Sequence, residues 1–335
     1  MHKMPVGVLG ASGYAGRELC ALVAAHPGLE LAFAAARERR GERARIGARE
    51  VTFIGADEAS LGDAALVFSA LPHGASAEWV GEARRAGAKV VDLSADLRPG
   101  NGAAGAHGAG EGSTDAPYGL PELTRDAVRV ASVVANPGCY PTATLLALLP
   151  LLARDLLAPG ATITVNAASG VTGAGFTPRH DLLFAEVSED FRAYGVGNEH
   201  RHLAEMRAVL AGFGGAAASA DLVFTPHLLP VARGILATIV VPVREEIADP
   251  LALWTQHYAG EPFVEIATAP PSLREVVRRN VARIHVTVAR GTRRPTLIIL
   301  AAIDNLVKGA AGQAVQNANL LLGLDETAGL LAGAR

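Results

Sequence analysis

A cysteine lies where an apolar strand pattern gives way to a helical one. In the segment Asn136-Pro-Gly-Cys139-Tyr-Pro141-Thr142, the proline suits the first turn of a helix, so Cys139 comes just before a helix N-terminus. The positive end of the helix dipole lowers the pKa of a thiol there and favours the reactive thiolate. The pattern predicts a nucleophile at Cys139, with a buried core residue as the alternative.

The second cysteine, Cys20, has a different setting. It lies on the inner side of an expected helix, among Leu19, Leu22 and Val23. We expect Cys20 to be a core residue and expect no disulfide between the two cysteines. Two unbridged cysteines are typical of a protein from a reducing cytosol.

Two histidines in Glu199-His200-Arg-His202-Leu-Ala-Glu205 are candidates for moving a proton near the thiol. If the segment begins a helix, the two side chains point about 200° apart, so only one of them can face the sulfur. Glu205 is three residues after His202 and can orient its ring. We therefore expect His202 to be the acid/base, and keep His200 as its rival or as a substrate ligand. A structural role or a chelating His-x-His pair is also open, but no third ligand at metal-like spacing is nearby, so we predict no metal.

The first strand ends in a glycine-rich turn, Gly10-Ala-Ser-Gly13-Tyr-Ala-Gly16, that opens a helix. Bare backbone at a helix N-terminus lets a pyrophosphate approach the free N–H groups. The spacing is Gly-x-x-Gly-x-x-Gly, so an ordinary tight turn is the alternative. The residues expected to contact a dinucleotide here are Gly10, Ser12, Gly13, Tyr14, Ala15 and Gly16.

The end of the second strand indicates which dinucleotide binds. NAD sites place an acidic residue about 20 residues after the glycines, whereas NADP sites place a cation there. Here Arg37 follows Gly16 by 21 residues, and Arg39 and Arg40 come next. This favours NADP(H), with a solvated basic turn as the alternative. A nicotinamide cofactor together with an activated cysteine suggests reduction of an enzyme-bound thioester.

The elements that must position these residues fall into two groups. In the first 135 residues, short apolar strands alternate with helices. We expect the strands at 6–9, 29–34, 66–70, 90–93 and 132–135, and the helices at 16–25 and 75–86. This order predicts an α/β fold with an N-terminal, Rossmann-type, doubly wound parallel sheet. A helix over 142–153 then precedes longer strands over 162–167, 234–243, 283–289 and 296–301, typical of an α+β domain with a largely antiparallel mixed sheet. A last helix, over 310–322, is expected to pack back on the first domain.

We expect an NADP-binding domain of residues 1–138, completed by 306–335, and a catalytic and oligomerisation domain of residues 139–305.

Composition limits the class of protein. The 335 residues carry a net charge of −3, and half of them are hydrophobic. This balance argues against nucleic acid as a partner, since nucleic-acid binding usually leaves a basic surplus. The longest apolar run, 142–153, is broken by Pro150 and is shorter than the roughly 20 residues that span a bilayer. The start of the chain leaves no room for a signal peptide. We therefore expect a cytoplasmic protein without a membrane partner.

Taken together, the motifs resemble those of the N-acetyl-γ-glutamyl-phosphate reductases, NADP-dependent enzymes of arginine biosynthesis. The matching segments, in family order, are 10–16, 92–98, 118–123, 136–142, 169–175, 194–196, 200–202, 224–228, 233–238 and 303–314. The resemblance implies a two-domain fold shared with aspartate-semialdehyde dehydrogenases, a small acyl-phosphate substrate and a homo-oligomer, dimer or tetramer. It also implies a nucleophile at Cys139 with a histidine partner.

The resemblance extends to further site residues. It implies that Asn305 lies near the nicotinamide, and it makes Ser169 and Gly170 further candidates for cofactor binding. The candidates for substrate binding are Arg98, Asn136, Glu205, His227 and Arg233. The two arginines would hold anions of the substrate, although each could instead form a structural ion pair, and His227 could instead cap a buried turn.

Three segments depart from the family pattern. The Gly/Ala-rich run 100–112, which we expect to be a mobile surface loop, replaces a stretch that is usually richer in aromatics. Phe176 replaces a residue that is commonly basic. The segment before the two histidines is longer than is usual in the family. One alternative function is therefore reduction of an aminoadipyl or glutamyl phosphate carried on an acidic amino-group carrier protein. That partner would need a basic rim, which Arg179, Arg192 and Arg201 could supply. A more remote alternative is a non-catalytic NADP-binding regulator.

Overall fold

The computed structural model describes residues 2–47, 49–101 and 116–331. The chain divides into two compact units, which we call unit 1 and unit 2. Unit 1 comprises Met1–Gly138 and Ala310–Arg335, and unit 2 comprises Cys139–Gly309. Most of the expected surface loop 100–112 lies outside the described residues.

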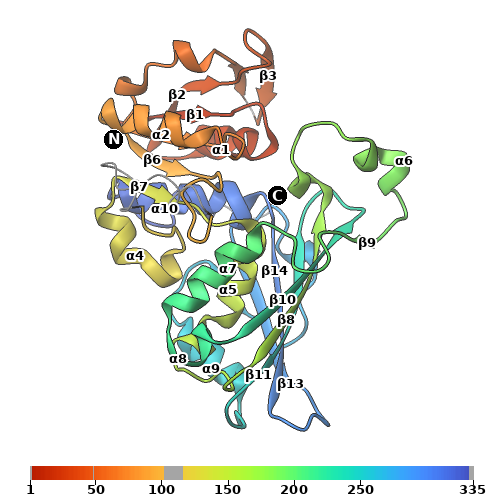
Figure 1. Cartoon of the computed structure of the whole chain (residues 1–335). Helices are drawn as coiled ribbons and strands as arrows, with labels where there is room; N and C mark the ends of the chain where they lie inside the picture. Colours follow the sequence, from red (N-terminus) through yellow and green to blue (C-terminus); the bar gives the residue numbers. More distant parts are fainter. Residues whose placement is uncertain (1, 48, 102–115, 332–335) are drawn as a thin grey trace. The chain divides into compact units, whose positions relative to one another are not determined.

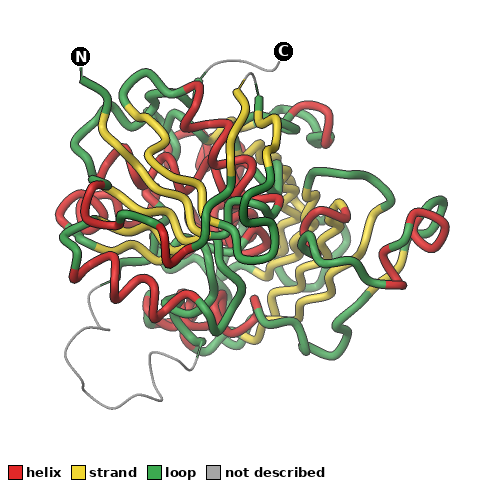
Figure 2. The backbone as a smooth tube through the Cα atoms, turned by 90° about the horizontal axis from the view of Figure 1, so that it is seen from above, coloured by secondary structure: helices red, strands yellow, loops and turns green. Residues whose placement is uncertain are grey.

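Unit 1 is built on a parallel sheet of five strands in the order β2-β1-β5-β6-β7. The strands span Met4–Leu9 (β1), Leu29–Ala35 (β2), Leu66–Ser69 (β5), Lys89–Asp92 (β6) and Val133–Ala135 (β7). They run alongside one another in Figure 2 and are almost wholly apolar, as expected where both faces of a sheet are covered. β2 lies on one side of β1 and β5 lies on the other, so the order of the strands reverses at β1. Ligands of doubly wound sheets bind at the carboxyl ends of the strands beside such a switch point.

Unit 1 contains the helices α1 (Tyr14–Ala25), α2 (Ser76–Arg85), α4 (Pro121–Val130) and α10 (Gly312–Leu321). Outside its main sheet, β3 (Arg43–Ile46) pairs with β4 (Arg49–Thr52). The C-terminal helix α10 packs against α1, α4 and β6, and all of its residues are buried. The Nδ2 of Asn317 donates to the Gly119 carbonyl (2.8 Å) and to Oδ1 of Asn136 (3.0 Å). The expected return of the final helix to the first domain is confirmed.

Unit 2 is built on a mixed sheet of seven strands in the order β12-β13-β14-β11-β8-β10-β9. The strands span Thr162–Gly170 (β8), Arg192–Ala193 (β9), Asp221–Leu229 (β10), Ile235–Pro242 (β11), Val264–Ile266 (β12), Ala282–Val288 (β13) and Thr296–Ile303 (β14). Only the pairs β8·β10 and β12·β13 are parallel. This confirms the predicted largely antiparallel mixed sheet, and with the sheet of unit 1 the predicted fold class.

The central helix of unit 2 is α5 (Cys139–Leu152), which packs against β11, β14 and α7 (His202–Gly212) (Figure 1). Residues 140–152 are all buried, as expected for a helix that is apolar on every side. Trp254 of α9 (Pro250–His257) donates from Nε1 to the Ala147 carbonyl (3.1 Å). The short helices α6 (Phe184–Val187) and α8 (Gly215–Ala218) complete the unit, with α6 at the far end of an excursion away from the sheet. These contacts fix α5, and with it the residue at its start.

Within the described part of the chain, no helix combines the length and the apolar character needed to cross a membrane.

Candidate active site

Cys139 is the first residue of α5 and is partly exposed, whereas the rest of that helix is buried. The preceding loop is fixed because the backbone N–H of Asn136 donates to the Asp92 carbonyl (2.8 Å). N–H groups in the first turn of a helix have no intrahelical acceptor, so this position favours a negative charge. By contrast, burial raises the pKa of the Cys20 thiol to about 12. Of the two thiols, Cys139 has the setting of a nucleophile.

A cluster of five rings surrounds this end of α5, and we call it the ring cluster. Its members are Tyr140, Tyr194, His200, His202 and Phe224. The two tyrosine hydroxyl oxygens are 3.0 Å apart, and the His200 ring centroid lies 5.5 Å from that of Tyr140 and 5.4 Å from that of Phe224. Burial raises the pKa of Tyr194 to about 12, and negative charge on Cys139 adds to this rise, as it does for Tyr140. The thiol therefore lies close to both tyrosines.

The two histidines are arranged differently from the expectation that they point apart. Helix α7 begins at His202, so His200 precedes the helix, and the two ring centroids are only 4.8 Å apart. The backbone N–H of His202 donates to Nδ1 of His200 (3.1 Å). Burial, with a smaller effect of Arg201, lowers the pKa of His200 to about 4. His200 is therefore a neutral ring at neutral pH, with its proton on Nε2. His202 and Glu205 are both buried in the first turn of α7.

Three further expected residues, Ser169, Gly170 and Arg233, meet where β8 ends and β11 begins in unit 2. Ser169 is buried and hydrogen-bonds through its side chain with Tyr140, which links this group to the ring cluster. A Cβ on Gly170 would lie 2.7 Å from the backbone nitrogen of Arg233, so the two strand ends approach closely there. Nη1 of Arg233 is 3.5 Å from Oδ2 of the buried Asp304. This contact supports the ion-pair alternative for Arg233.

Asn305 makes two hydrogen bonds within unit 2. Its Oδ1 accepts from the backbone N–H of Gly234 (2.7 Å), and its Nδ2 donates to Oγ1 of Thr172 (2.9 Å). A nicotinamide carboxamide would have to share or replace these bonds. In the structure, Asn305 ties the segment after β8 to the start of β11.

His227, on β10, makes its ring contact with a residue outside the ring cluster. Its ring stacks on that of Phe191, with centroids 5.2 Å apart and planes 11° from parallel. This contact gives His227 a packing role in the structure, and its expected contact with the substrate stays a prediction.

The glycine-rich turn of unit 1 contains two glycines that the fold itself requires. A Cβ on Gly10, which has φ of 76°, would lie 2.4 Å from the Ala70 carbonyl oxygen, and one on Gly16 would lie 2.2 Å from the Gly10 carbonyl oxygen. Gly13, the N-cap of α1, is different: its φ is −72°, and a Cβ there would meet only the Gly10 oxygen, at 3.6 Å. Internal packing does not explain Gly13, but close approach of a ligand to the start of α1 does. The turn thus fits a pyrophosphate.

Arg37 differs from its neighbours. Nη2 of Arg39 pairs with Oε2 of Glu42 (2.6 Å), and Arg40 pairs with Glu58 and lies 3.6 Å from Asp57. Arg37 is exposed, and its side chain forms no hydrogen bond or ion pair with the described residues. It follows β2, whose Ala35 carbonyl accepts from the Ala11 N–H of the glycine-rich turn (2.9 Å). This guanidinium, which has no partner among the described residues, therefore lies at the carboxyl ends of the strands, beside the glycine-rich turn.

Arg98 and Asn136, expected to bind substrate, are buried and bonded inside unit 1. Arg98 donates from Nε to the Asn136 carbonyl (2.7 Å) and from Nη2 to the Leu93 carbonyl (2.6 Å). Nδ2 of Asn136 donates to the Ala310 carbonyl (3.3 Å). These contacts hold the loop before Cys139, and they support the structural alternative for Arg98.

The basic rim expected for an acidic carrier is largely neutralised. Arg179 makes two hydrogen bonds to Asp181, and Arg192 pairs with Asp190 and donates to the Glu186 carbonyl (3.1 Å). The segment 176–201 carries three arginines and five carboxylates. This charge does not favour an acidic partner.

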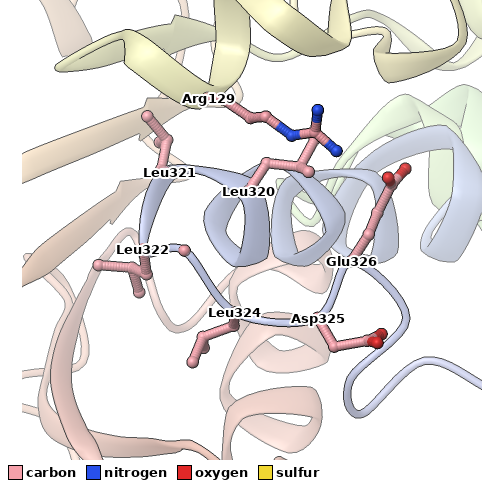
Figure 3. A pocket seen from close by; sticks show the side chains of 8 residues that line it. Arg129, Leu320, Leu321, Leu322, Leu324, Asp325 and Glu326 are labelled. Atoms are coloured by element: carbon pink, nitrogen blue, oxygen red, sulfur yellow. The ribbon is translucent and has the colours of Figure 1, made fainter.

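Within the described residues, no group of three or more His, Cys, Asp or Glu side chains is placed to hold a metal ion. A hollow of about 680 Å³ lies in unit 1 between Arg129 and the chain 320–326 that ends α10 (Figure 3). It is lined by none of the expected site residues.

The sequence reasoning missed Tyr140, Tyr194 and Asp304 as parts of the site. Tyr140 follows the expected nucleophile directly, and Tyr194 and Asp304 lie in segments that match the family motifs. No local sequence pattern shows which side chains these three residues contact. The contacts that bring them into the site, between Tyr140 and Tyr194 and between Arg233 and Asp304, join residues more than 50 positions apart in the chain.

Comparison with known proteins gives consistent matches. Residues 5–131 match the family model of the semialdehyde dehydrogenase NAD binding domain, and residues 139–305 match that of the semialdehyde dehydrogenase dimerisation domain. Two relatives, each named N-acetyl-gamma-glutamyl-phosphate reductase, come from Cellvibrio japonicus (42% identical over 341 residues) and Ectopseudomonas mendocina (44% over 340 residues). In both cases 97% of this chain and 97% of the relative are covered.

Solved structures show the same fold at lower identity. Aspartate semialdehyde dehydrogenase II from Vibrio cholerae superposes with a TM-score of 0.76 at 19% identity, covering 96% of this chain and 99% of that one. The aspartate semialdehyde dehydrogenase with NADP from Candida albicans gives 0.68 at 15% identity, covering 95% and 98%. The two-part architecture is thus shared with these enzymes.

Proposed function

The chain belongs to the semialdehyde dehydrogenase family, and we propose that it reduces N-acetyl-γ-glutamyl phosphate to N-acetylglutamate semialdehyde, with NADPH as reductant and release of phosphate, in arginine biosynthesis. One observation carries the proposal: relatives more than 40% identical across nearly the whole chain are named as this reductase. The partly exposed thiol that starts α5 beside the ring cluster agrees with it. Two unbridged thiols agree with a cytoplasmic location.

Residues of unit 1 fit the proposed cofactor. The turn 10–16 would take the pyrophosphate at the start of α1, and Arg37 would take the 2′-phosphate that distinguishes NADPH from NADH. Two findings support this: the glycine at position 13 that packing does not require, and the one unpaired arginine at the end of β2. When bound, the cofactor supplies a hydride.

Cys139 begins the chemistry in this proposal. Its thiolate forms a bond to the acyl carbon of the substrate, the carbon–oxygen bond to phosphate breaks, and phosphate leaves. With the cofactor bound, the carbonyl carbon of this thioester would accept the hydride that the cofactor supplies. The carbon–sulfur bond of the resulting thiohemiacetal breaks, which releases the aldehyde and returns the thiolate.

We assign the proton transfers of this sequence to His202. A proton must be supplied to the oxygen of the thiohemiacetal and removed again as the aldehyde forms. His200 is less suited, because its pKa of about 4 leaves it almost wholly unprotonated at neutral pH. The ring of His202 contacts those of Tyr140 and His200, beside Cys139.

We also propose that the protein is a homo-oligomer assembled through unit 2. Unit 2 matches a dimerisation domain, and the excursion bearing α6 exposes Leu183, Phe184 and Phe191, with Phe184 86% exposed. Aromatic residues exposed this far are typical of a surface covered by a partner. Light scattering should give a mass of at least two chains, and Phe184→Asp should shift it toward one. A monomeric wild type would contradict this proposal.

The reverse reaction tests the proposed function. N-acetylglutamate semialdehyde, phosphate and NADP⁺ are mixed with the wild type, Cys139→Ala or Cys20→Ala, and the absorbance of NADPH is followed. We expect phosphate-dependent turnover in the wild type and in Cys20→Ala, and none in Cys139→Ala, which should still bind NADPH. A wild type that binds NADPH but does not turn over would reject this substrate and direct the assay to carrier-bound substrates. Failure on those as well would favour the regulator.

A further inference from the structure

Gly309 lies in a π-helical turn, Val307–Ala311, that follows β14. Its backbone N–H donates to the Asp304 carbonyl (2.9 Å), five residues back, which is the hydrogen bond of a π-turn. Such turns are rare and occur frequently at functional sites, since they place a residue where an α-helix would not. Here the residue so placed is a glycine.

The turn brings Gly309 against the nucleophile. A Cβ on Gly309 would lie 2.8 Å from the Cβ of Cys139 and 3.2 Å from the Asp304 carbonyl oxygen. Non-bonded carbon atoms pack about 3.5–4.0 Å apart, so a Cβ would overlap Cys139. The Cβ of Cys139 is attached directly to the backbone of α5 and cannot swing away as the tip of a long side chain can. A side chain at position 309 is therefore incompatible with the observed place of Cys139.

The buried side chain of Asp304 holds this turn. Oδ1 accepts the backbone N–H groups of Leu306 (2.7 Å) and Val307 (3.1 Å), and Oδ2 accepts that of Arg278 (2.7 Å). One carboxylate thus fastens the start of the turn to the segment between β12 and β13. The fully buried Lys308, whose Nζ lies 5.5 Å from the ring centroid of Phe263, fixes the turn next to Gly309.

We propose that Gly309 is a positioning residue for the nucleophile: its bare backbone forms the surface on which the Cβ of Cys139 sits, and the turn held by Asp304 keeps that surface in place. The inference rests on the proposed function for the role of Cys139 as nucleophile. The start of α5 alone does not fix where the sulfur of Cys139 points. In this proposal the sulfur's position also depends on the turn that contains Gly309.

The first test measures the thiol itself and needs no substrate. Gly309→Ala is compared with Gly212→Ala, a glycine-to-alanine change in α7 where a Cβ would have no atom within 4 Å. Alkylation of Cys139 by iodoacetamide is followed by mass spectrometry from pH 6 to 9. We expect at least a tenfold slower reaction in Gly309→Ala, with its midpoint at higher pH, and wild-type behaviour in Gly212→Ala. In the assay above, Gly309→Ala should lose at least tenfold in kcat with KM for phosphate within threefold.

The second test is a stability cycle that holds even if Gly309→Ala is poorly folded in the wild-type background. Cys139→Gly removes the Cβ that the new methyl group would strike. Gly309→Ala should therefore lower the Tm by about 5 °C in the wild type and by less than half of that in Cys139→Gly. Equal losses in the two backgrounds, or wild-type alkylation and kcat in Gly309→Ala, would overturn the proposal. If the cycle and the alkylation behave as expected but the wild type does not reduce the acyl phosphate, the proposed function fails and the positioning role stands.

Discussion

His200 and His202 are separated by a single residue, yet their surroundings give their rings different chemistry. The N–H of His202 fixes Nδ1 of His200 as an acceptor, and burial keeps the pKa of His200 at about 4. At pH 7 a group with that pKa is protonated in about one molecule in a thousand, which makes it a poor proton donor. His200 instead packs within the ring cluster and supports the first residue of α7.

We predict that replacing each histidine by asparagine separates these roles. His202→Asn should lower kcat by about 10²–10⁴-fold with NADPH affinity unchanged, because it removes the proposed acid/base. His200→Asn should lower kcat by less than about tenfold, since it removes packing and the acceptor of one hydrogen bond. Steady-state kinetics of both variants measure this. If the larger loss falls on His200→Asn, the two roles must be exchanged.

Arg37 offers a second test at the scale of one side chain. Arg37→Ala should weaken NADPH binding by about 10–100-fold, as expected for lost hydrogen bonds between charged groups, and should change NADH binding by less than about threefold. Arg40→Ala is the matched control, because that guanidinium is already paired with Glu58 and Asp57. Fluorescence titration with both cofactors gives the affinities. Equal weakening of NADPH and NADH would show that Arg37 does not contact the 2′-phosphate.

At the scale of elements, the sequence predicted most strands to within one or two residues, because strands buried on both faces are continuous apolar runs bounded by turns. The final helix was expected over 310–322 and spans Gly312–Leu321. Helix α5 begins three residues earlier than the expected 142, at the cysteine itself. The proline at position 141 thus marks the first turn of the helix, as its missing N–H allows.

The contacts between elements were much harder to predict. The segment 199–205 does contain the start of α7, at His202, but the sequence between 171 and 201 has no periodic pattern that shows at which residue the helix begins. That irregular chain carries Tyr194 back to Tyr140, 54 residues away. The bonds of Asn305 and Arg98 were also missed, because their partners are backbone groups, which every sequence has. Residue type and spacing thus predicted a chemistry for the site, but not these partners.

The turn between β1 and α1 gives a prediction at this scale, because its glycines serve different purposes. Gly16→Ala should destabilise unit 1 by about 1–3 kcal/mol, since the new Cβ would lie 2.2 Å from a backbone oxygen. Gly13→Ala should cost less than about 1 kcal/mol, yet should weaken NADPH binding at least tenfold by blocking the start of α1. Urea unfolding and cofactor titration measure the two effects. Full NADPH affinity in Gly13→Ala would argue against a pyrophosphate at this turn.

At the scale of the whole molecule, one buried histidine, His26, and two half-buried ones, His200 and His257, connect stability to pH. Burial is the main cause that lowers the pKa of His26 in unit 1 and of His200 and His257 in unit 2. A histidine with a lowered pKa binds fewer protons in the folded than in the unfolded chain, so its contribution to stability is lost as the pH falls below about 6.5. The buried carboxyl of Asp92 acts in the opposite sense, because burial raises its pKa.

Because these groups oppose one another, the effect of His200 has to be isolated by substitution. Between pH 7.5 and 5, the free energy of unfolding of His200→Gln should fall by about 1 kcal/mol less than that of the wild type, after allowance for the partial exposure of the ring. The window follows from an unfolded pKa near 6.5 and a folded pKa of about 4. Urea unfolding followed by circular dichroism at both pH values measures the difference, with His180→Gln, at an exposed position, as control. The same pH dependence in all three proteins would mean that the ring cluster tolerates a charged His200, and the argument that excludes it as the proton donor would fail.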